Sequence, residues 1–269
     1  MNEFNFTPKL TIDRIKQYLR DGKRFDGRTP EEFREITIEN GVSRKAEGSA
    51  KVKIGNTEVI VGIKMDVGTP YADSPNKGNL MVTAELTPLS SSRFEAGPPR
   101  FSAIEIGRVI DRGLRESKFI DFEKLCIKKG EKVWTVYVDI YSINDDGNLL
   151  DAAGIAAIAA LKDTRIPEYD EEKGVVLYGE LTNKKINLSQ EMPIPITVYK
   201  VGSKFLADPT REEEDASETR ITLGSFNGAI FSIQKGELGF LTQEEFEKSL
   251  ELNERAWKLV HKKVEKQFK

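Results

Sequence analysis

The 269-residue sequence predicts an α/β (α+β) fold made of two similar β-α units, in which mixed sheets pack on helices. Residues 133–167 run from an alternating strand pattern through a glycine turn into a helix of small apolar residues. Beyond a charged, glycine-containing stretch, a second set of strand patterns leads into a long helix that begins near Thr242. The expected organisation is an N-terminal helix and loop (1–28), a first domain (29–167), a linker or surface excursion (168–190) and a second domain (191–269).

Periodicity and turn signals predict the elements of the first half. A short helix is expected over residues 11–21, with Thr11 as N-cap and Gly22 just past its end. Gly55-Asn56 is a two-residue hairpin signal between two strand patterns. Apolar residues at helical spacing predict a helix over residues 101–117. The expected strands are residues 34–40, 49–54, 57–65, 79–89 and 133–143.

The second half repeats a feature of the first. Residues 53–55 and 200–202 each place a lysine, an apolar residue and a glycine between two strand patterns. Each of these hairpins is followed later by further strand and then by a helix. The pattern favours an internal duplication, and chance similarity between two hairpins is the alternative.

Composition excludes several classes of protein. The net charge is −3, so a nucleic-acid site must be a local basic patch. One cysteine and one histidine are too few for a disulfide or a Cys/His zinc site, and Cys126 suits a reducing cytoplasm. His261 lies among lysines and is expected to be an ordinary surface residue. Since no apolar run approaches membrane-spanning length and no signal-peptide core is present, a cytoplasmic protein without membrane contact is expected.

Residues 146–151 combine a glycine turn with the start of a helix. A helix N-terminus offers free N–H groups and a positive dipole end to an anion. A phosphate site there normally carries serine, threonine or arginine as well, but this chain has Leu149, Leu150 and Asp151. Leucine donates no hydrogen bond and aspartate repels a phosphate. The sequence therefore predicts that residues 146–151 form an anion cradle, a helix start shaped to bind an anion, without the side chains that would hold the anion.

The helix expected over residues 101–117 carries a row of arginines. Arg108, Arg112 and Arg115 are spaced four and three residues apart and therefore share one face. Such a row can follow successive phosphates of a single strand. The alternative is a solvated face on which nearby acids partner the arginines. The opposite face is apolar, and the acids are Glu105, Asp111 and Glu116.

Other charged groups allow two interpretations each. Arg93 and Arg100 flank a glycine- and proline-bearing loop, and either line a channel or are ordinary loop residues. The acidic run 212–215 is expected to be a solvated loop rather than a metal site. Asp26 and Arg28 are expected to fix their loop by a charged hydrogen bond.

Taken in order, these segments resemble the ribonuclease PH superfamily. The resemblance begins with RFDGRTPEEFREI at residues 24–36, continues through the hairpin at Gly55-Asn56, and extends to the C-terminal helix. Within the superfamily, the segments most similar to the non-catalytic ribonuclease-PH-like subunit of the archaeal exosome are FEAGPP, GRVIDRGLRES, DGNLLDAAGIAAIAAL and DPTREEE. The resemblance implies the ribonuclease PH fold over nearly the whole chain.

The same resemblance implies partners and an activity. Three such subunits would alternate with three catalytic ribonuclease-PH-like sister subunits in a heterohexameric ring that carries RNA-binding cap subunits. The ring would degrade single-stranded RNA from its 3′ end by phosphate attack. Phosphate and Mg²⁺ would act at the sister subunit, and no cofactor or metal is implied for this chain. Arg108, Arg112 and Arg115 would face the shared active site and bind RNA, with Arg93 and Arg100 as further candidates.

Two departures from the catalytic pattern imply that this chain is not itself an enzyme. Catalytic members carry Gly-Ser/Thr-Arg where residues 147–150 read GNLL, so the phosphate site formed by Asn148, Leu149 and Leu150 is degenerate. They also carry two aspartates six residues apart, where Asp208 and Glu214 stand here. Because glutamate can replace aspartate chemically, an independently active phosphorolytic ribonuclease using Asp208 and Glu214 is the alternative. A third interpretation is a scaffold whose arginines never contact RNA.

Overall fold

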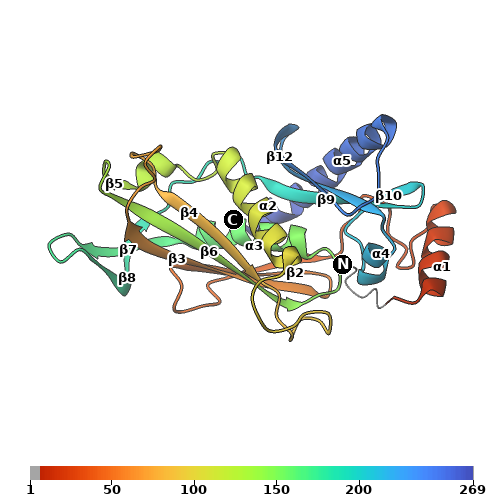
Figure 1. The fold of residues 1–269 in the computed structure, drawn as a ribbon, viewed down its shortest axis with the longest axis horizontal. Coiled ribbons are helices and arrows are strands. Elements are labelled where there is room, and N and C mark those ends of the chain that lie inside the picture. The colour runs from red at the N-terminus through yellow and green to blue at the C-terminus, as the bar shows by residue number, and fades with distance from the viewer. Residues whose placement is uncertain (1–6, 269) are drawn as a thin grey trace.

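The computed structural model describes residues 7–268, and two large sheets organise them (Figure 1). In the first sheet the strand order is β1-β2-β3-β6-β4, with β5 paired to β6; β4 runs parallel to β6 and the other pairs are antiparallel. Its strands are β1 (Ile36–Asn40), β2 (Gly48–Ile54), β3 (Thr57–Gly68), β4 (Asn79–Glu85), β5 (Cys126–Lys128) and β6 (Lys132–Asn144).

The second sheet is antiparallel throughout and has the order β10-β9-β11-β12. Its strands are β9 (Ile194–Val201), β10 (Lys204–Ala207), β11 (Thr219–Phe226) and β12 (Ala229–Gly236). A separate hairpin pairs β7 (Arg165–Asp170) with β8 (Val175–Lys185). The helices are α1 (Lys9–Arg20), α2 (Phe101–Glu116), α3 (Leu149–Asp163), α4 (Arg211–Asp215) and α5 (Gln243–Gln267), with a 3-10 turn η1 (Phe122–Leu125). None of them is long and apolar enough to cross a membrane, within the described part of the chain.

Helix α3 joins the two sheets. Every residue from Leu149 to Leu161 is buried, because the helix packs on β2 and β3 of the first sheet and on β9 of the second. Alanine and glycine let the backbones approach closely. At Gly154 a Cβ atom would come within 2.1 Å of Cγ of Pro195, the second residue of β9. The small-residue helix predicted from the sequence is therefore the centre of the core, and α2 packs beside it on β4 and β12.

The expected helices and hairpins are present, with some boundaries shifted. Thr242 caps α5 in a reciprocal capping box with Glu245, as the predicted helix start requires. The prediction that Thr11 caps the first helix is wrong, because α1 begins at Lys9, directly after Pro8. Gly22 follows the helix with a φ of +73°, as expected. The two similar hairpins both turn at a glycine with positive φ, namely Gly55 (+57°) and Gly202 (+61°).

The segment expected to be a linker or surface excursion contains an ordered hairpin. β7 and β8 pair around a turn that ends at Gly174, whose φ is +69°. The hairpin projects from one end of the molecule, opposite the end that carries α1 (Figure 1). The charged composition of residues 168–174 concealed the β-branched pair Val175 and Val176, which opens β8.

His261 is not an ordinary surface side chain. Its ring stacks on Trp257 with 4.6 Å between ring centroids, and it meets Phe226 edge-on. The expectation of a surface residue rested on the lysines around it on α5, which face solvent while the imidazole ring packs against these aromatic side chains.

Candidate phosphate cradle and arginine face

The cradle predicted at the start of α3 is present, and an acidic side chain of the same protein occupies it. β6 ends at Asn144, and the chain turns through Gly147 (φ +84°) and Asn148 (φ +61°) into the helix. The backbone N–H of Asn148 donates to Oε2 of Glu214 at 2.8 Å. Glu214 lies on α4 in the second sheet's domain. A carboxylate of the chain itself therefore accepts the hydrogen bond that an anion would take at this helix start.

The backbone of the second domain closes over the turn. A Cβ atom at Gly147 would come within 2.7 Å of the carbonyl oxygen of Pro209 and within 2.8 Å of the backbone nitrogen of Arg211. Glycine is therefore required at this position both by its positive φ and by the close approach of another backbone segment. The space beside the cradle is filled by residues 209–211.

Helix α4 brings charged groups to the cradle. Its capping box, formed by Thr210 and Glu213, fixes the start of the helix. Arg211 pairs with Asp145 at 3.3 Å, Glu214 at 3.6 Å and Asp215 at 2.9 Å. Burial disfavours the charge of Arg211, but the acids around it more than offset this and raise its pKa. Arg211 therefore stays positively charged, and its charge is balanced by acidic side chains of the same chain.

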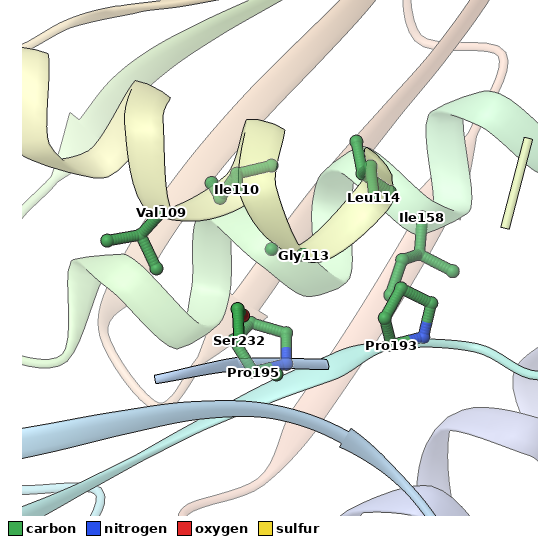
Figure 2. A pocket seen from close by; sticks show the side chains of 10 residues that line it. Val109, Ile110, Gly113, Leu114, Ile158, Pro193, Pro195 and Ser232 are labelled. Carbon is green, nitrogen blue, oxygen red and sulfur yellow. The ribbon is translucent and has the colours of Figure 1, made fainter. Parts of the chain in front are cut away.

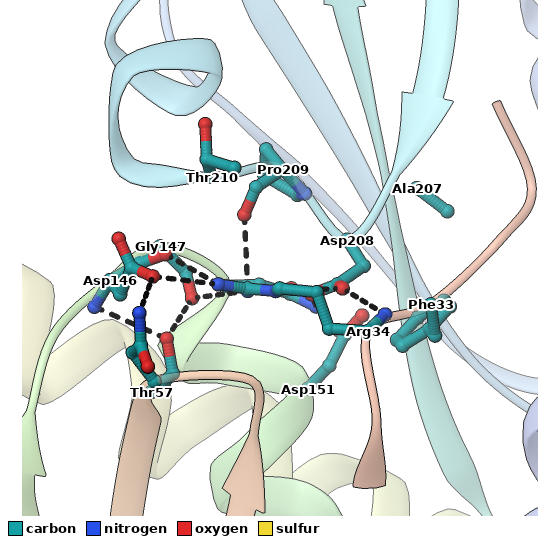
Figure 3. A network of polar contacts seen from close by, with 12 residues as sticks. Phe33, Arg34, Thr57, Asp146, Gly147, Asp151, Ala207, Asp208, Pro209 and Thr210 are labelled. Atoms are coloured by element: carbon teal, nitrogen blue, oxygen red, sulfur yellow. Dashed lines mark hydrogen bonds and ion pairs between the residues drawn. The ribbon is translucent and has the colours of Figure 1, made fainter. Parts of the chain in front are cut away.

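Asp208 is the centre of a buried ion-pair network (Figure 3). It accepts hydrogen bonds from the Arg34 backbone N–H and from Nε and Nη2 of Arg34 at 2.7–2.9 Å. Nη1 of Arg28 (2.8 Å) and Nδ2 of Asn148 (3.0 Å) also donate to it. Burial alone would raise the pKa of Asp208, but the hydrogen bonds and charge of Arg34 prevail and lower it. The carboxylate is therefore ionised and has its acceptor capacity committed to this chain.

The three residues that replace the phosphate ligands all point into the protein. Leu149 and Leu150 belong to the hydrophobic core. The prediction that Asp151 repels an anion at the cradle is wrong, because its carboxylate is fully buried against β9. It accepts from the backbone N–H of Thr197 at 3.0 Å and from Thr197 Oγ1 at 2.6 Å. Burial raises the pKa of Asp151 to about 7, against the effect of these hydrogen bonds.

The acidic motif, Asp208 and Glu214, forms no metal centre in the described residues. Asp208 and Glu214 lie on either side of Asn148, which they hold through Nδ2 and the backbone N–H, respectively. Within residues 7–268, no group of three or more histidine, cysteine or acidic side chains is arranged to hold a metal ion. The run 212–215 is not the solvated loop expected from the sequence, since it forms α4 and Glu213 is buried in a two-point ion pair with Arg24.

The arginine row of α2 divides into exposed and engaged members. Arg108 is exposed and has no hydrogen-bond or ion-pair partner among residues 7–268. Arg112 keeps 63% of its side chain exposed and approaches Glu116 only to 3.9 Å. Arg115 pairs with Asp111 at 2.8 Å and donates to the carbonyl oxygen of Leu80 on β4. Two of the predicted pairings therefore exist, while the third acid, Glu105, is buried and pairs with Arg220 instead.

Arg93 and Arg100 lie apart from this row. Arg93 makes two hydrogen bonds to Asp215 and so belongs to the ion-pair network of α4. Arg100 is exposed and pairs with Glu95 within its own loop. Arg28 does bond to Asp26, as expected, with 2.7 Å between Nε and Oδ2. It also reaches across to Asp208, which the sequence did not indicate.

A small cavity lies where α2, α3 and the second sheet meet (Figure 2). Its volume of about 10 Å³ is roughly that needed for one water molecule. The lining is almost wholly apolar, with glycines at positions 113, 154 and 224. The cavity is therefore a packing seam between the domains and offers no ligand site.

The residues that fill the cradle do not stand out in the sequence. Arg34 lies within a strand pattern, and Glu214 stands out only as part of the acidic motif. The available signal is the RFDGR…R segment, which places three arginines just before the first strand. Their partners in the second domain, Glu213 and Asp208, lie more than 170 positions away in sequence, so periodicity and spacing could not connect them.

The chain is similar to proteins of one kind along nearly its full length. Residues 32–167 match the model of the 3′ exoribonuclease family, domain 1, and residues 191–256 match that of domain 2. Exosome complex component Rrp42 of Methanothermobacter thermautotrophicus is 42% identical over 260 residues, covering 94% of this chain and 93% of the relative. The protein of the same name from Thermococcus onnurineus is 45% identical over 256 residues, covering 94% of this chain and 93% of the relative.

Solved structures give the same result. A chain of the Archaeoglobus fulgidus exosome with RNA bound to the active site superimposes with a TM-score of 0.85 and 43% identity, covering 94% of this chain and 97% of that chain. A chain of an archaeal exosome core superimposes with a TM-score of 0.81 and 39% identity, covering 94% of this chain and 96% of that chain. The two-sheet fold described above is that of these exosome chains.

Proposed function

Because the chain belongs to the 3′ exoribonuclease family, we propose that it is a non-catalytic subunit of an exosome ring that degrades RNA from the 3′ end by phosphorolysis. In this proposal it binds single-stranded RNA and completes the active site of a catalytic sister subunit. Its relatives named exosome complex component Rrp42, and the solved exosome with RNA in its active site, support the assignment to such a complex.

One observation carries the non-catalytic assignment: the carboxylate of Glu214 accepts from the backbone N–H of Asn148 at the start of α3. An attacking phosphate is an anion and would need this helix start together with further donors. The resident carboxylate competes for the N–H group and repels a second anion, and Leu149 and Leu150 supply no donor. Phosphate has no place to be held for attack on RNA.

The alternative is an independently active ribonuclease that uses Asp208 and Glu214. The contacts of Asp208 disfavour it, because a carboxylate bound by Arg34, Arg28 and Asn148 is a poor metal ligand and a poor base. We therefore place phosphate and Mg²⁺ at the sister subunit. We further propose three copies of each subunit in the ring, RNA-binding cap subunits above it, and a cytoplasmic location.

RNA binding is assigned to the exposed arginines of α2. Arg108 has no partner in the described chain, and Arg112 is held only loosely by Glu116. Arg115 adds charge to the same face, although Asp111 shares it. Arg93 is bound by Asp215, so we leave it outside the RNA face; Arg100 is solvent-exposed and pairs with Glu95.

The test is phosphate-dependent decay of single-stranded RNA by three preparations: this chain alone, the catalytic ribonuclease-PH-like subunit from the same genome, and the two together. The expected result is no release of nucleoside diphosphates by this chain alone and faster release by the mixture than by the sister alone. Release by the purified chain that disappears in Asp208→Ala, while circular dichroism shows that this variant is still folded, would establish the alternative. If the sister degrades RNA at the same rate with and without this chain, this chain is a scaffold that does not contribute to the active site.

A further inference from the structure

Helix α2 presents a single stripe of exposed side chains. Its other positions are buried or half-buried, because the helix packs on β4 and β12. The exposed side chains recur at spacings of three and four residues, so they lie along one line on the helix. They are Phe101, Ile104, Arg108, Arg112 and Glu116. The two arginines of the proposed RNA face therefore continue, towards the start of the helix, into an exposed apolar pair.

Phe101, the first residue of α2, does not contribute to the packing of the described chain. It is 75% exposed and Ile104 is 50% exposed, and neither belongs to the hydrophobic core of residues 7–268 or packs against it. Within the same residues, the ring of Phe101 has no aromatic neighbour and no cation over its face. The first turn of a helix favours proline and acidic residues, not phenylalanine. Neither core packing nor helix initiation therefore explains the exposed ring.

The charges around this ring suit a polyanion. In the described chain, α2 has no acidic residue in its first turn and no side-chain cap, so the positive end of its dipole is not offset there. Arg108, which has no partner among residues 7–268, lies seven residues from Phe101, about 10 Å along the helix. Arg112 lies about 6 Å further on. The ring, the helix start and the two arginines thus form one path about 16 Å long.

A single strand of RNA carries both kinds of group that this path would bind. Its phosphates pair with arginines, and its unpaired bases offer flat faces that stack on aromatic rings. A double strand keeps its base faces inside the helix, so it has none to offer to Phe101. A protein partner would need an apolar patch for the ring directly beside an acidic patch for the arginines, whereas every nucleotide of a single strand supplies a base and a phosphate. The path therefore favours single-stranded RNA.

We infer that Phe101 is a base-stacking residue of the RNA path: an unpaired base of the substrate lies on its ring while phosphates of nearby nucleotides meet Arg108 and Arg112. Ile104 lies between the ring and the arginines and gives the strand a further apolar contact. The inference rests on the proposed function, because it takes α2 as the RNA face. It adds a contact that depends on neither charge nor base identity, since every base has a π-face. The stacked base positions the strand, and the phosphates alone do not.

The first experiment measures single-stranded RNA affinity of the complex with the catalytic ribonuclease-PH-like subunit, in buffer without phosphate so that no phosphorolysis occurs. Phe101→Ala should weaken binding at least about fivefold. The salt dependence should keep its slope, because a stacked base displaces no counterion. Phe101→Trp retains an aromatic face and should bind like wild type or more tightly. The control is Tyr178→Ala, which removes an aromatic ring that is 57% exposed on β8 and should leave RNA affinity unchanged.

The second experiment locates the stacked base. It uses RNAs of one length, each lacking the base of a single nucleotide. The wild-type complex should lose affinity when the base is missing at one position, counted from the 3′ end. The Phe101→Ala complex should lose nothing further at that position, because the ring on which the base stacks is already absent. A loss of the same size in both complexes would mean that this base stacks elsewhere, and would overturn the inference.

Three further outcomes separate this inference from the proposed function. If Arg108→Ala/Arg112→Ala weakens RNA binding and Phe101→Ala does not, the inference is wrong and the proposed function stands. If Phe101→Ala weakens association with the catalytic subunit but the assembled complex binds RNA normally, the ring contacts protein and the inference is wrong. If none of these α2 variants changes RNA affinity, the inference fails together with the assignment of RNA to this helix.

Discussion

Arg34 and Asp208 form a two-point ion pair across the boundary of the two domains, with Nη2–Oδ1 at 2.7 Å and Nε–Oδ2 at 2.9 Å. Arg34 precedes the first strand of the first sheet, and Asp208 follows β10 of the second. The same guanidinium donates to the carbonyl oxygens of Asp146 and Pro209. The pair therefore ties both walls of the closed cradle together, and the acidic motif serves to hold the domains.

Asp208→Asn should destabilise the chain by about 3 kcal/mol, because it removes the buried counter-charge that Arg34 and Arg28 share. The two guanidinium groups then keep only the partly exposed carboxylates of Asp146 and Asp26. Urea denaturation followed by circular dichroism measures the loss. Glu212→Gln is the control, since Glu212 is exposed on α4 and its change should stay within about 0.5 kcal/mol. Equal stability of the two variants would mean that the Arg34–Asp208 pair contributes little.

Asp151 should make stability depend on pH. Burial raises its pKa to about 7 in the folded chain, above the ordinary aspartate value of 3.8. The folded state thus binds the proton more tightly than the unfolded state, so this contribution is complete below about pH 4 and is lost as pH rises to about 7. The full effect is at most about 4 kcal/mol. Asp151→Asn retains an acceptor for the Thr197 N–H and cannot titrate.

The measurement is the free energy of unfolding of wild type and Asp151→Asn at intervals from about pH 4.5 to about pH 8, a range that covers most of the interval between the unfolded and folded pKa values of Asp151. Other titrating groups are common to both proteins and cancel in the difference. Wild type should lose stability relative to the variant as pH rises across this range. Parallel curves would show that Asp151 keeps an ordinary pKa in the folded chain.

Two helical glycines should respond in opposite directions to alanine. A Cβ atom at Gly154 would lie 2.1 Å from Cγ of Pro195, so Gly154→Ala should cost about 1–3 kcal/mol through overpacking. At Gly113 the nearest atom is 3.8 Å away, which is an ordinary contact. Gly113→Ala should therefore be neutral or stabilising by up to about 1 kcal/mol from helix propensity. Thermal melting of the pair tests this, and a tolerated alanine at position 154 would show that α3 and β9 can separate easily.

Much of the fold could be predicted from local pattern. Strand alternation indicated β6, the Gly55-Asn56 turn indicated the first hairpin, and helical spacing indicated α2. Pairings between distant segments could not be predicted in this way. The parallel addition of β4 beside β6, and the β7–β8 hairpin hidden in a charged stretch, depend on tertiary packing.

The sequence predicted that the candidate site lacks phosphate ligands, but it did not predict which groups take their place. The leucines after Gly147 indicated that phosphate ligands are missing, and both are buried in the core. The sequence did not indicate that Glu214 would take the anion's place, because Glu214 lies 66 positions from Asn148. Nor did it show that Asp151 faces inward, since a single turn of helix leaves both directions open.

The arginine face leads to a prediction about salt. In the assembled complex, Arg108→Ala/Arg112→Ala should weaken RNA binding similarly for every RNA sequence, because backbone phosphates carry no base identity. Both side chains are exposed, so folding stability should change by no more than about 1 kcal/mol. The matched control is Arg44→Ala/Arg255→Ala, which removes the same charge from positions outside α2.

RNA affinity across a salt series separates direct phosphate binding from general attraction. Each arginine that no longer binds a phosphate of the single strand should flatten the log–log dependence of affinity on salt by about 0.7. Replacement of both Arg108 and Arg112 therefore predicts a change of about 1.4 in slope, with slower decay by the complex. The control changes only the long-range field, so its slope and decay rate should stay close to those of wild type. Equal slopes for all three complexes, with equal decay rates, would leave these arginines as surface charges and this subunit as scaffold, because a side chain that displaces no counterion binds no phosphate.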